Sequence, residues 1–319
     1  MDEPEIVVLQ EDVHGMAIAQ YVEAIEERIP DATVRYARTP AQRREYLQSA
    51  DIATGLTIDH EVLEKATNLE LFACMYAGTG HLDLDVFESR GVTVTSAAGV
   101  HTSNISEYIV GSMIAFARQF RQGLRQQERH EWRGYQTREL FGSQATIVGL
   151  GAIGSAIVDR LEAFGMETVG VRYSPEKGGP TSEVYGFDEI HEAVAGSEYV
   201  VLACPLTDTT EQLIDREVFR TMRPDALLVN IARGRVVDTD GLVDALKSNA
   251  IAGATLDVTD PEPLPEDHPL WRFENVRITP HNAGHTPAYF ERCADILAEN
   301  VEKLRENPAG TLTNQVTSN

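Results

Sequence analysis

The chain has 319 residues, a length that favours two domains of about 150 residues each. Fifty acidic residues against 27 basic ones leave a formal net charge of −23, so the surface repels nucleic acid and anionic lipid. No apolar run is long enough to cross a membrane, and three widely spaced cysteines form neither a disulfide framework nor a metal cluster. A soluble, cytoplasmic protein is therefore expected.

Lysine is scarce among the basic residues, with only four in the whole chain. A strongly acidic, lysine-poor surface favours adaptation to a very salty cell interior, where dissolved ions screen the repulsion between carboxylates. The alternative is an ordinary acidic enzyme.

Apolar runs and helical patterns alternate along the first half of the chain. This alternation is typical of a parallel α/β sheet, because each strand is followed by a helix that returns the chain to the same edge. A helix is predicted over Met16–Ile29, and a long helix over Asn104–Arg129 is expected to join two domains. Strands are predicted at Ile6–Leu9, Thr33–Ala37, Asp51–Thr54, Leu69–Met75 and Val92–Thr95.

A second alternation begins at Ala145. Helices are predicted over Ile153–Phe164 and Thr239–Ser248, and the proline-rich segment Asp260–Glu266 is expected to be an irregular loop. A further helix follows Pro287 and runs to about Arg305, and the polar tail after it is expected to be disordered. Strands are predicted at Ala145–Gly149, Thr168–Arg172, Tyr199–Ala203, Ala226–Ile231, Ala252–Asp257 and Val276–Thr279.

A glycine-rich turn follows the first strand of this second half. Gly149, Gly151 and Gly154 match the pattern G-x-G-x-x-G, which is weak alone but here follows an apolar strand and opens a helix. The three glycines permit a tight turn, close approach of a pyrophosphate and close packing of the helix on the sheet, respectively. The N–H groups of Ala152 and Ile153 then face the anion. The sequence predicts a dinucleotide site; the alternative is a strand-turn-helix without a ligand.

The end of the next strand bears on the choice between the two nicotinamide dinucleotides. A residue about 20 positions beyond the glycines meets the adenosine ribose, and an acidic residue there selects NAD. Arg172 stands at this place, followed by Tyr173 and Ser174 and close to Lys177. Because arginine pairs with a 2′-phosphate and accepts no hydrogen bond from a 2′-hydroxyl, the sequence predicts a preference for NADPH and leaves NADH open. The alternative is a solvated arginine beside a site that takes either cofactor.

Three segments that each follow a predicted strand contain the candidate catalytic side chains Arg233, Glu262 and His281. Strand ends of an open α/β sheet meet at one edge, so these side chains are expected to converge beside the nicotinamide. Hydride transfer to a keto carbon creates an alkoxide, which needs a proton donor that titrates near neutrality, and histidine is the usual one. A carboxylate orients the imidazole, and arginine offers a planar pair of donors to a substrate carboxylate. Each residue alone is more often structural, so the prediction depends on the set.

Together these features resemble the D-2-hydroxyacid dehydrogenase family over nearly the whole chain. After the glycine motif come Asn-x-x-Arg-Gly ending at Gly234, then Leu-Asp-Val and Glu-Pro around Asp257 and Glu262, and finally Pro-His before Gly-x-Thr from Pro280. The resemblance implies an α/β fold of two Rossmann-like, doubly wound parallel-sheet domains. A flavodoxin-like substrate domain is expected at 1–100 plus 287–319, and a dinucleotide-binding domain at 101–286. The implied reaction is the reduction of 2-keto acids to D-2-hydroxy acids.

The resemblance also implies roles for individual residues. Arg233 binds the substrate, Glu262 is the partner of the histidine, and His281 is the acid/base and contacts the substrate. The backbone of Ala77, Gly78 and Thr79 is expected to receive the substrate carboxylate, and Asp257 to hold the nicotinamide amide. The expected cofactor contacts, besides those of the glycine motif and the Arg172 segment, are Cys204, Pro205, Thr210, Ile231, Ala232, Arg233, Asp257, His281, Ala283 and Gly284.

The family resemblance also bears on the metal requirement, the alternative functions and the oligomeric state. Glu262 argues against a formate dehydrogenase, which has glutamine at that place. No metal is expected, because no cysteine and histidine group has zinc-ligand spacing and the reaction needs none. A glyoxylate or hydroxypyruvate reductase of the same fold and a nucleotide-sensing, corepressor-like binding protein remain open. The family implies a homodimer; the motifs do not define which keto acid is bound.

Overall fold

The computed structural model of the chain describes residues 3–9, 12–13 and 15–317. The chain divides into two compact units, of which unit 1 comprises Met1–His101 and His285–Asn319 and unit 2 comprises Thr102–Gly284. Each unit is built around its own parallel sheet with helices on both faces, which confirms the predicted fold class.

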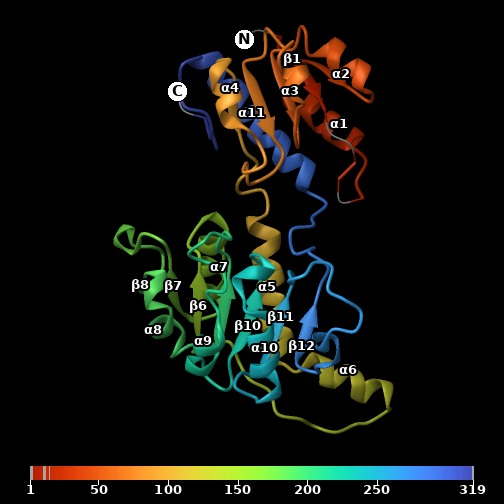
Figure 1. The fold of residues 1–319 in the computed structure, drawn as a ribbon. Helices are drawn as coiled ribbons and strands as arrows, with labels where there is room; N and C mark the ends of the chain where they lie inside the picture. Colours follow the sequence, from red (N-terminus) through yellow and green to blue (C-terminus); the bar gives the residue numbers. More distant parts are fainter. Residues whose placement is uncertain (1–2, 10–11, 14, 318–319) are drawn as a thin grey trace. The chain divides into compact units, whose positions relative to one another are not determined.

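Unit 1 contains a five-stranded parallel sheet in the order β2-β1-β3-β4-β5, the flavodoxin-like order. Alternate residues of β1 face opposite layers: Ile6 and Val8 pack with α1 and α11, whereas Val7 packs with α3 and α4. Figure 1 shows the C-terminal helix α11, in blue, beside the red and orange elements of the N-terminus. The strands are β1 Glu5–Val8, β2 Thr33–Tyr36, β3 Ile52–Gly55, β4 Leu71–Cys74 and β5 Thr93–Thr95, and the helices are α1 Ala19–Arg28, α2 Pro40–Tyr46, α3 His60–Leu63, α4 Leu84–Ser89 and α11 Tyr289–Glu306.

Unit 2 contains a seven-stranded parallel sheet in the order β12-β11-β10-β9-β6-β7-β8. Counted from β6, this is the Rossmann order with one more strand at the edge. One face packs against α5 and α7, and the other against α8, α9 and α10. The strands are β6 Gln144–Val148, β7 Glu167–Val171, β8 Glu183–Tyr185, β9 Tyr199–Leu202, β10 Leu227–Asn230, β11 Gly253–Leu256 and β12 Val276–Ile278, and the helices are α5 Thr102–Ala117, α6 Phe120–Glu128, α7 Ala152–Ala163, α8 Ile190–Val194, α9 Arg216–Thr221 and α10 Thr239–Lys247.

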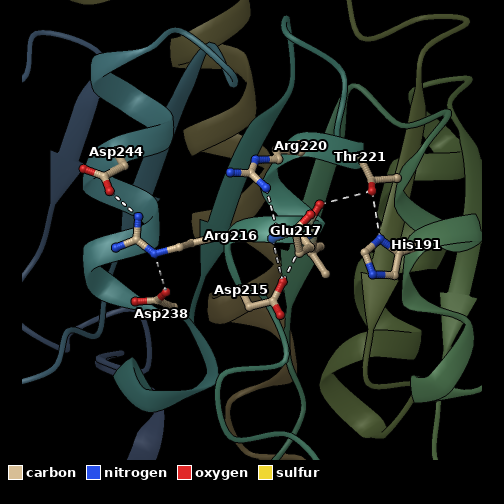
Figure 2. A network of polar contacts seen from close by, with 9 residues as sticks. His191, Asp215, Arg216, Glu217, Arg220, Thr221, Asp238 and Asp244 are labelled. Atoms are coloured by element: carbon tan, nitrogen blue, oxygen red, sulfur yellow. Dashed lines mark hydrogen bonds and ion pairs between the residues drawn. The ribbon is translucent and has the colours of Figure 1, made fainter.

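Arginine–carboxylate pairs tie together the helices on the second face of unit 2. Figure 2 shows the Arg216 guanidinium between Asp244 of α10 and Asp238, which precedes that helix. The Asp238 carboxylate also accepts the Gly241 N–H at 3.0 Å and so caps α10. Arg216 thus links α9 to α10 and to the residue that caps it.

The predicted long helix over Asn104–Arg129 is wrong in one respect, since it is two helices. Gln119 adopts a left-handed conformation with φ of 52° between α5 and α6. The Ala117 carbonyl at the end of α5 accepts the Arg138 N–H at 2.8 Å, so the returning segment satisfies a group that a continuous helix would have satisfied internally. Arg121 donates to the carbonyls of Glu274 and Val276 and fixes the new direction of α6.

The polar tail expected to be disordered is instead packed on unit 1 through residue 317. The Val316 N–H donates to the Val94 carbonyl at 2.9 Å, which extends the edge of β5. Asn300 is fully buried on α11 and bonds both the N–H and the carbonyl of Thr313, at 2.7 and 3.1 Å. Satisfied backbone groups and a buried amide therefore order a segment whose composition suggested disorder.

The predicted strands all occur, each within two residues of its expected bounds, while the short edge strand β8 has no counterpart among them. Among the described residues, no helix combines the length and the apolar character needed to cross a membrane.

Candidate active site

The three motif glycines lie in the turn between β6 and α7. Gly149 has φ of 105°, and a Cβ there would lie 2.7 Å from the backbone of Ala203 and Cys204. A Cβ on Gly154 would lie 1.9 Å from the Gly149 carbonyl oxygen, so this glycine is required for close packing of the helix. Gly151, in contrast, faces open space, with no atom within 4 Å of an added Cβ. The turn therefore has the open cradle that a pyrophosphate needs, with the N–H groups of Ala152 and Ile153 at the start of α7.

Arg172 directly follows β7, at the same edge of the sheet. Its backbone N–H donates to Tyr185 of β8, and its Nη1 donates to the Gly178 carbonyl at 2.7 Å. Tyr173 is 79% exposed, and Ser174 directly precedes a single 3-10 turn over Pro175–Lys177. Arg172 is thus held beside the turn by the loop that follows it, with further guanidinium donors to offer.

The turn after β9 contains Cys204, Pro205 and Thr210. Burial raises the pKa of the Cys204 thiol to about 11, so this side chain packs and is no nucleophile at neutral pH. The buried Thr210 hydroxyl donates to the Pro205 carbonyl at 2.6 Å and accepts the Thr207 N–H at 2.8 Å. Its role in the structure is to shape the turn, which leaves Pro205 exposed at the surface.

The segment after β10 is organised by Asn230. This buried amide accepts the Ala232 N–H and donates to the Arg233 carbonyl, both at 3.0 Å. A Cβ on Gly234 would lie 2.0 Å from the Thr259 carbonyl oxygen, so only glycine lets this segment contact the proline-rich loop. Ile231 and Ala232 are buried, and Arg233 is exposed and extended, with Nη1 donating to the Ala232 carbonyl.

His281 and Glu262 lie together after β12 and β11. His281 Nδ1 lies 2.9 Å from Glu262 Oε1, and the two side chains are 50% and 40% exposed. His281 has φ of 54°, a left-handed conformation that is unusual for a residue with a side chain. Because a carboxylate only accepts, Nδ1 carries a hydrogen and Nε2 is the ring nitrogen left to exchange a proton with a substrate.

Asp257 is the residue that shapes the histidine loop. Its buried carboxylate accepts the Thr279 hydroxyl at 2.6 Å and the N–H groups of Asn282 and Ala283 at 3.0 and 2.9 Å, and its carbonyl accepts the His281 N–H. The resemblance suggested only a contact with the cofactor for this residue. Within the described residues, the observed partners of its carboxylate are groups of the loop that ends at Gly284.

In unit 1, Ala77, Gly78 and Thr79 lie in the loop after β4. Ala77 and Gly78 are exposed, and no atom lies within 4 Å of a Cβ added to Gly78. Beside them, Tyr76 is 47% exposed and meets the His81 ring edge-on, while His81 Nε2 lies 2.7 Å from the Leu56 carbonyl oxygen. The loop therefore presents backbone N–H groups at the surface of unit 1.

Sequence reasoning gave no role to four residues of this site: Asn230, Gly234, Tyr108 and Asn104. Asn230 and Gly234 lie within the Asn-x-x-Arg-Gly motif, so an amide at the end of a strand and a glycine after the arginine are the signals that could have pointed to them. Tyr108 and Asn104 lie on α5, about 170 residues before the loop that they contact, and no local pattern connects them with it. No group of three metal-ligating side chains is found in the part of the chain that the structure describes.

Comparison with known proteins agrees with this geometry. Residues 110–283 match the family model described as "D-isomer specific 2-hydroxyacid dehydrogenase, NAD binding domain". The chain is 32% identical over 286 residues to D-3-phosphoglycerate dehydrogenase of Methanocaldococcus jannaschii, which covers 88% of the chain but only 54% of that enzyme. It is 38% identical over 257 residues to glyoxylate reductase of Thermofilum pendens, covering 76% of the chain and 74% of that enzyme.

Among solved structures, a D-isomer specific 2-hydroxyacid dehydrogenase from Xanthobacter autotrophicus in complex with NADPH and MES is similar, with a TM-score of 0.81 and 27% identity over 98% of each chain. The matched family model covers more than half of the chain, and the glycine turn, the Arg233 segment and the His281–Glu262 pair occupy one edge of one sheet. The chain belongs to the D-isomer specific 2-hydroxyacid dehydrogenase family, a family of nicotinamide-dependent oxidoreductases.

Proposed function

We propose that this chain reduces small 2-keto acids to D-2-hydroxy acids, with Arg233, Glu262 and His281 as its catalytic residues. The observation that carries the proposal is the 2.9 Å contact between His281 Nδ1 and Glu262, which leaves Nε2 as the proton donor. The open cradle at Gly151 fits the pyrophosphate of a nicotinamide dinucleotide, which when bound supplies a hydride to the keto carbon.

Each residue then has a defined task. The Arg233 guanidinium has donors beyond the one used on the Ala232 carbonyl, and these hold the substrate carboxylate and polarise the keto oxygen. From the family resemblance, the backbone N–H groups of Gly78 and Thr79 in unit 1 are proposed as further donors to a substrate carboxylate. As negative charge develops on the keto oxygen, His281 Nε2 delivers a proton to it, and Glu262 stabilises the protonated ring and its orientation.

The reaction can be tested by following NADPH and NADH oxidation with pyruvate, glyoxylate, hydroxypyruvate and longer or branched 2-keto acids. We expect turnover of at least one, a D-configured product, and loss of most turnover in His281→Ala with little change in NADPH affinity. If every keto acid is inert while NADPH still binds, the reductase proposal is wrong and a nucleotide-sensing binding protein is favoured.

Glyoxylate or hydroxypyruvate is the second candidate substrate. Relatives named glyoxylate reductase, and a human one named glyoxylate reductase/hydroxypyruvate reductase that is 36% identical, support this choice. In the panel, a kcat/KM for these two compounds well above that for branched keto acids supports it, and the reverse order refutes it.

We also propose that the cofactor is NADPH in preference to NADH. The supporting observations are an arginine in place of an acid after β7, a neighbouring Ser174, and the hydrogen bond that holds Arg172 to Gly178. Arg172→Asp should raise the KM for NADPH by at least tenfold and leave the KM for NADH unchanged or lower. Arg160→Asp on the outside of α7 is the control, and equal effects on both cofactors would contradict the assignment.

We further propose that the protein forms a homodimer through α6 and the segment after it. Phe120 and Leu124 are 51% and 60% exposed and Trp132 is fully exposed, beside a hollow of about 900 Å³ lined by Arg121, Arg125 and other arginines. Apolar side chains this exposed mark an interaction surface, and the arginines beside them can pair with carboxylates of the second copy. Light scattering should give twice the chain mass, falling toward one mass in a Leu124→Glu, Trp132→Ala double variant; a monomeric parent protein refutes it.

Adaptation to high salt is the last part of the proposal. The charge of −23 and the four lysines support it, because close carboxylates destabilise the folded chain unless ions screen them. Stability and activity should fall as potassium chloride is lowered from molar to millimolar concentrations, and equal values throughout would contradict it.

A further inference from the structure

A chain of hydrogen bonds runs from helix α5 into the loop that carries His281. The Tyr108 hydroxyl lies 2.6 Å from Thr279 Oγ1, which lies 2.6 Å from Asp257 Oδ1. An ionised carboxylate has no hydrogen to give, so the Thr279 hydroxyl donates to Asp257. Its single hydrogen is then used, and Tyr108 must be the donor to Thr279. The direction of both hydrogen bonds is thereby fixed.

The protonation state of Tyr108 is consistent with its hydroxyl donating to Thr279. Burial is the main cause that raises the pKa of Tyr108, and the nearby Asp257 charge adds to it, so the phenol keeps its proton. Neighbouring hydrogen bonds in such a chain polarise and strengthen one another.

A second side chain of α5, four residues before Tyr108, also forms a hydrogen bond to this loop. Asn104 Nδ2 donates to the Ala283 carbonyl at 3.0 Å, and Ala283 N–H donates to Asp257 Oδ2 at 2.9 Å. Residues four apart on a helix share one face, so Asn104 and Tyr108 approach the loop together. Asn104 holds the Ala283 carbonyl, and Tyr108 holds, through Thr279, the carboxylate to which the Ala283 N–H is bonded.

The element held in this way is the turn that presents His281. The ring reaches Glu262 from a left-handed backbone conformation, which is strained for a residue with a side chain. Three successive N–H groups, those of His281, Asn282 and Ala283, bond to Asp257 and keep the turn in that conformation. If the Asp257 carboxylate is free to rotate, two of these bonds are weakened together.

We infer that Tyr108 and Asn104 are positioning residues for the reduction: Tyr108 holds the Asp257 carboxylate through Thr279, Asn104 holds the Ala283 carbonyl, and both thereby fix the His281 turn from helix α5. This inference rests on the proposed function for its consequence in catalysis, although the hydrogen bonds that carry it are independent of any substrate. Neither residue touches the imidazole, so each acts through the loop.

The test compares two variants that break the chain of hydrogen bonds, Tyr108→Phe and Thr279→Val, with two controls. Thr279→Ser keeps the hydroxyl, and Tyr185→Phe removes a tyrosine hydroxyl at the distant β8. With the best keto acid, the first two should lower kcat by about 5- to 30-fold and change the substrate KM by less than threefold. Thr279→Ser and Tyr185→Phe should retain kcat within about threefold. Equal kcat in Tyr108→Phe and the parent protein, or failure of Thr279→Ser to retain activity, overturns the inference.

A second readout needs no substrate. Hydrogen exchange of the peptide that contains His281, Asn282 and Ala283 should be about tenfold faster in Tyr108→Phe and Thr279→Val than in the parent protein and the two controls. Unchanged exchange refutes the inference even if the chain has no keto acid activity. If exchange is faster in these two variants than in the parent protein and the parent protein reduces no keto acid, only the proposed function is refuted.

Discussion

Asn230 offers the sharpest test of how the Arg233 segment is held. Asn230→Asp keeps the shape of the side chain and the oxygen that accepts the Ala232 N–H, but places a second carboxylate oxygen 3.0 Å from the Arg233 carbonyl oxygen. Two acceptors repel, and the side chain is 1% exposed, so water cannot relieve the contact. The variant must bury this charge or take up a proton, and the protonated form again donates to Arg233.

The cost follows from the ordinary ionisation of aspartate. At pH 7.5, protonating a carboxyl whose pKa is normally roughly 3.9 costs about 5 kcal/mol, at about 1.4 kcal/mol per pH unit. At pH 5.0 the same cost is about 1.5 kcal/mol. Because the folded chain raises the pKa of this carboxyl, the folded variant regains stability as pH falls. The variant should therefore lose up to about 5 kcal/mol at pH 7.5 and about 3 kcal/mol less at pH 5.0.

Urea unfolding of the parent protein, Asn230→Asp and Asn230→Ala at both pH values measures this. The alanine variant, which has no carboxyl, should show a loss that is the same at both pH values. Asn249→Asp, which adds the same charge at an exposed position of unit 2, should be nearly neutral. A stability loss in Asn230→Asp that does not depend on pH would refute the reasoning, as would a variant as stable as the parent at pH 7.5.

Further outcomes are expected at three other places. Glu262→Gln should lower kcat by roughly 10- to 100-fold, because it removes the charge 2.9 Å from the His281 ring. Glu266→Gln, in the same loop, is the control and should leave kcat unchanged. Equal kcat in both variants excludes the proposed role of Glu262. Gly154→Val should remove cofactor binding measured by fluorescence titration, because its Cβ would lie 1.9 Å from the Gly149 carbonyl oxygen; normal affinity would exclude the close packing described. Burial raises the pKa of Cys204 to about 11 and of Cys293 to about 12, and all three cysteines are buried. At about pH 8 the folded protein should therefore release no colour from a disulfide reagent, whereas all three cysteines should react after denaturation in urea. Rapid reaction of the folded protein would show that these thiols are exposed.

The sequence pattern predicted the sheets well, because apolar runs in a buried parallel sheet are continuous and helix starts are marked by glycine or by capping residues. The pattern failed for segments whose structure depends on partners that are far away in the sequence. The break at Gln119 depends on Arg138 returning to the Ala117 carbonyl, and the order of the tail depends on the buried amide of Asn300. Neither partner is adjacent in sequence to the segment that it controls.

In the candidate active site, too, local patterns predicted some residues and could not predict those that act through long-range contacts. Residues that stand directly after strands, such as His281 and Arg233, could be placed because strand ends of a parallel sheet share an edge. The supports of these residues could not, since Tyr108 and Asn104 come from a helix and act through the Asp257 carboxylate. Thr210 stays a predicted cofactor contact, and its buried hydroxyl bonds the Pro205 carbonyl of its own turn.

The discontinuity of unit 1 has a consequence for synthesis on the ribosome. Unit 2 is one uninterrupted stretch, Thr102–Gly284, and its sheet is complete once that stretch has emerged. Residues 1–101 emerge before unit 2, yet only α1 covers the sheet face of Ile6 and Val8 until α11 arrives some 190 residues later. The segment made first is thus the one that finishes folding last, and during elongation it exposes apolar strands that chaperones would need to shield.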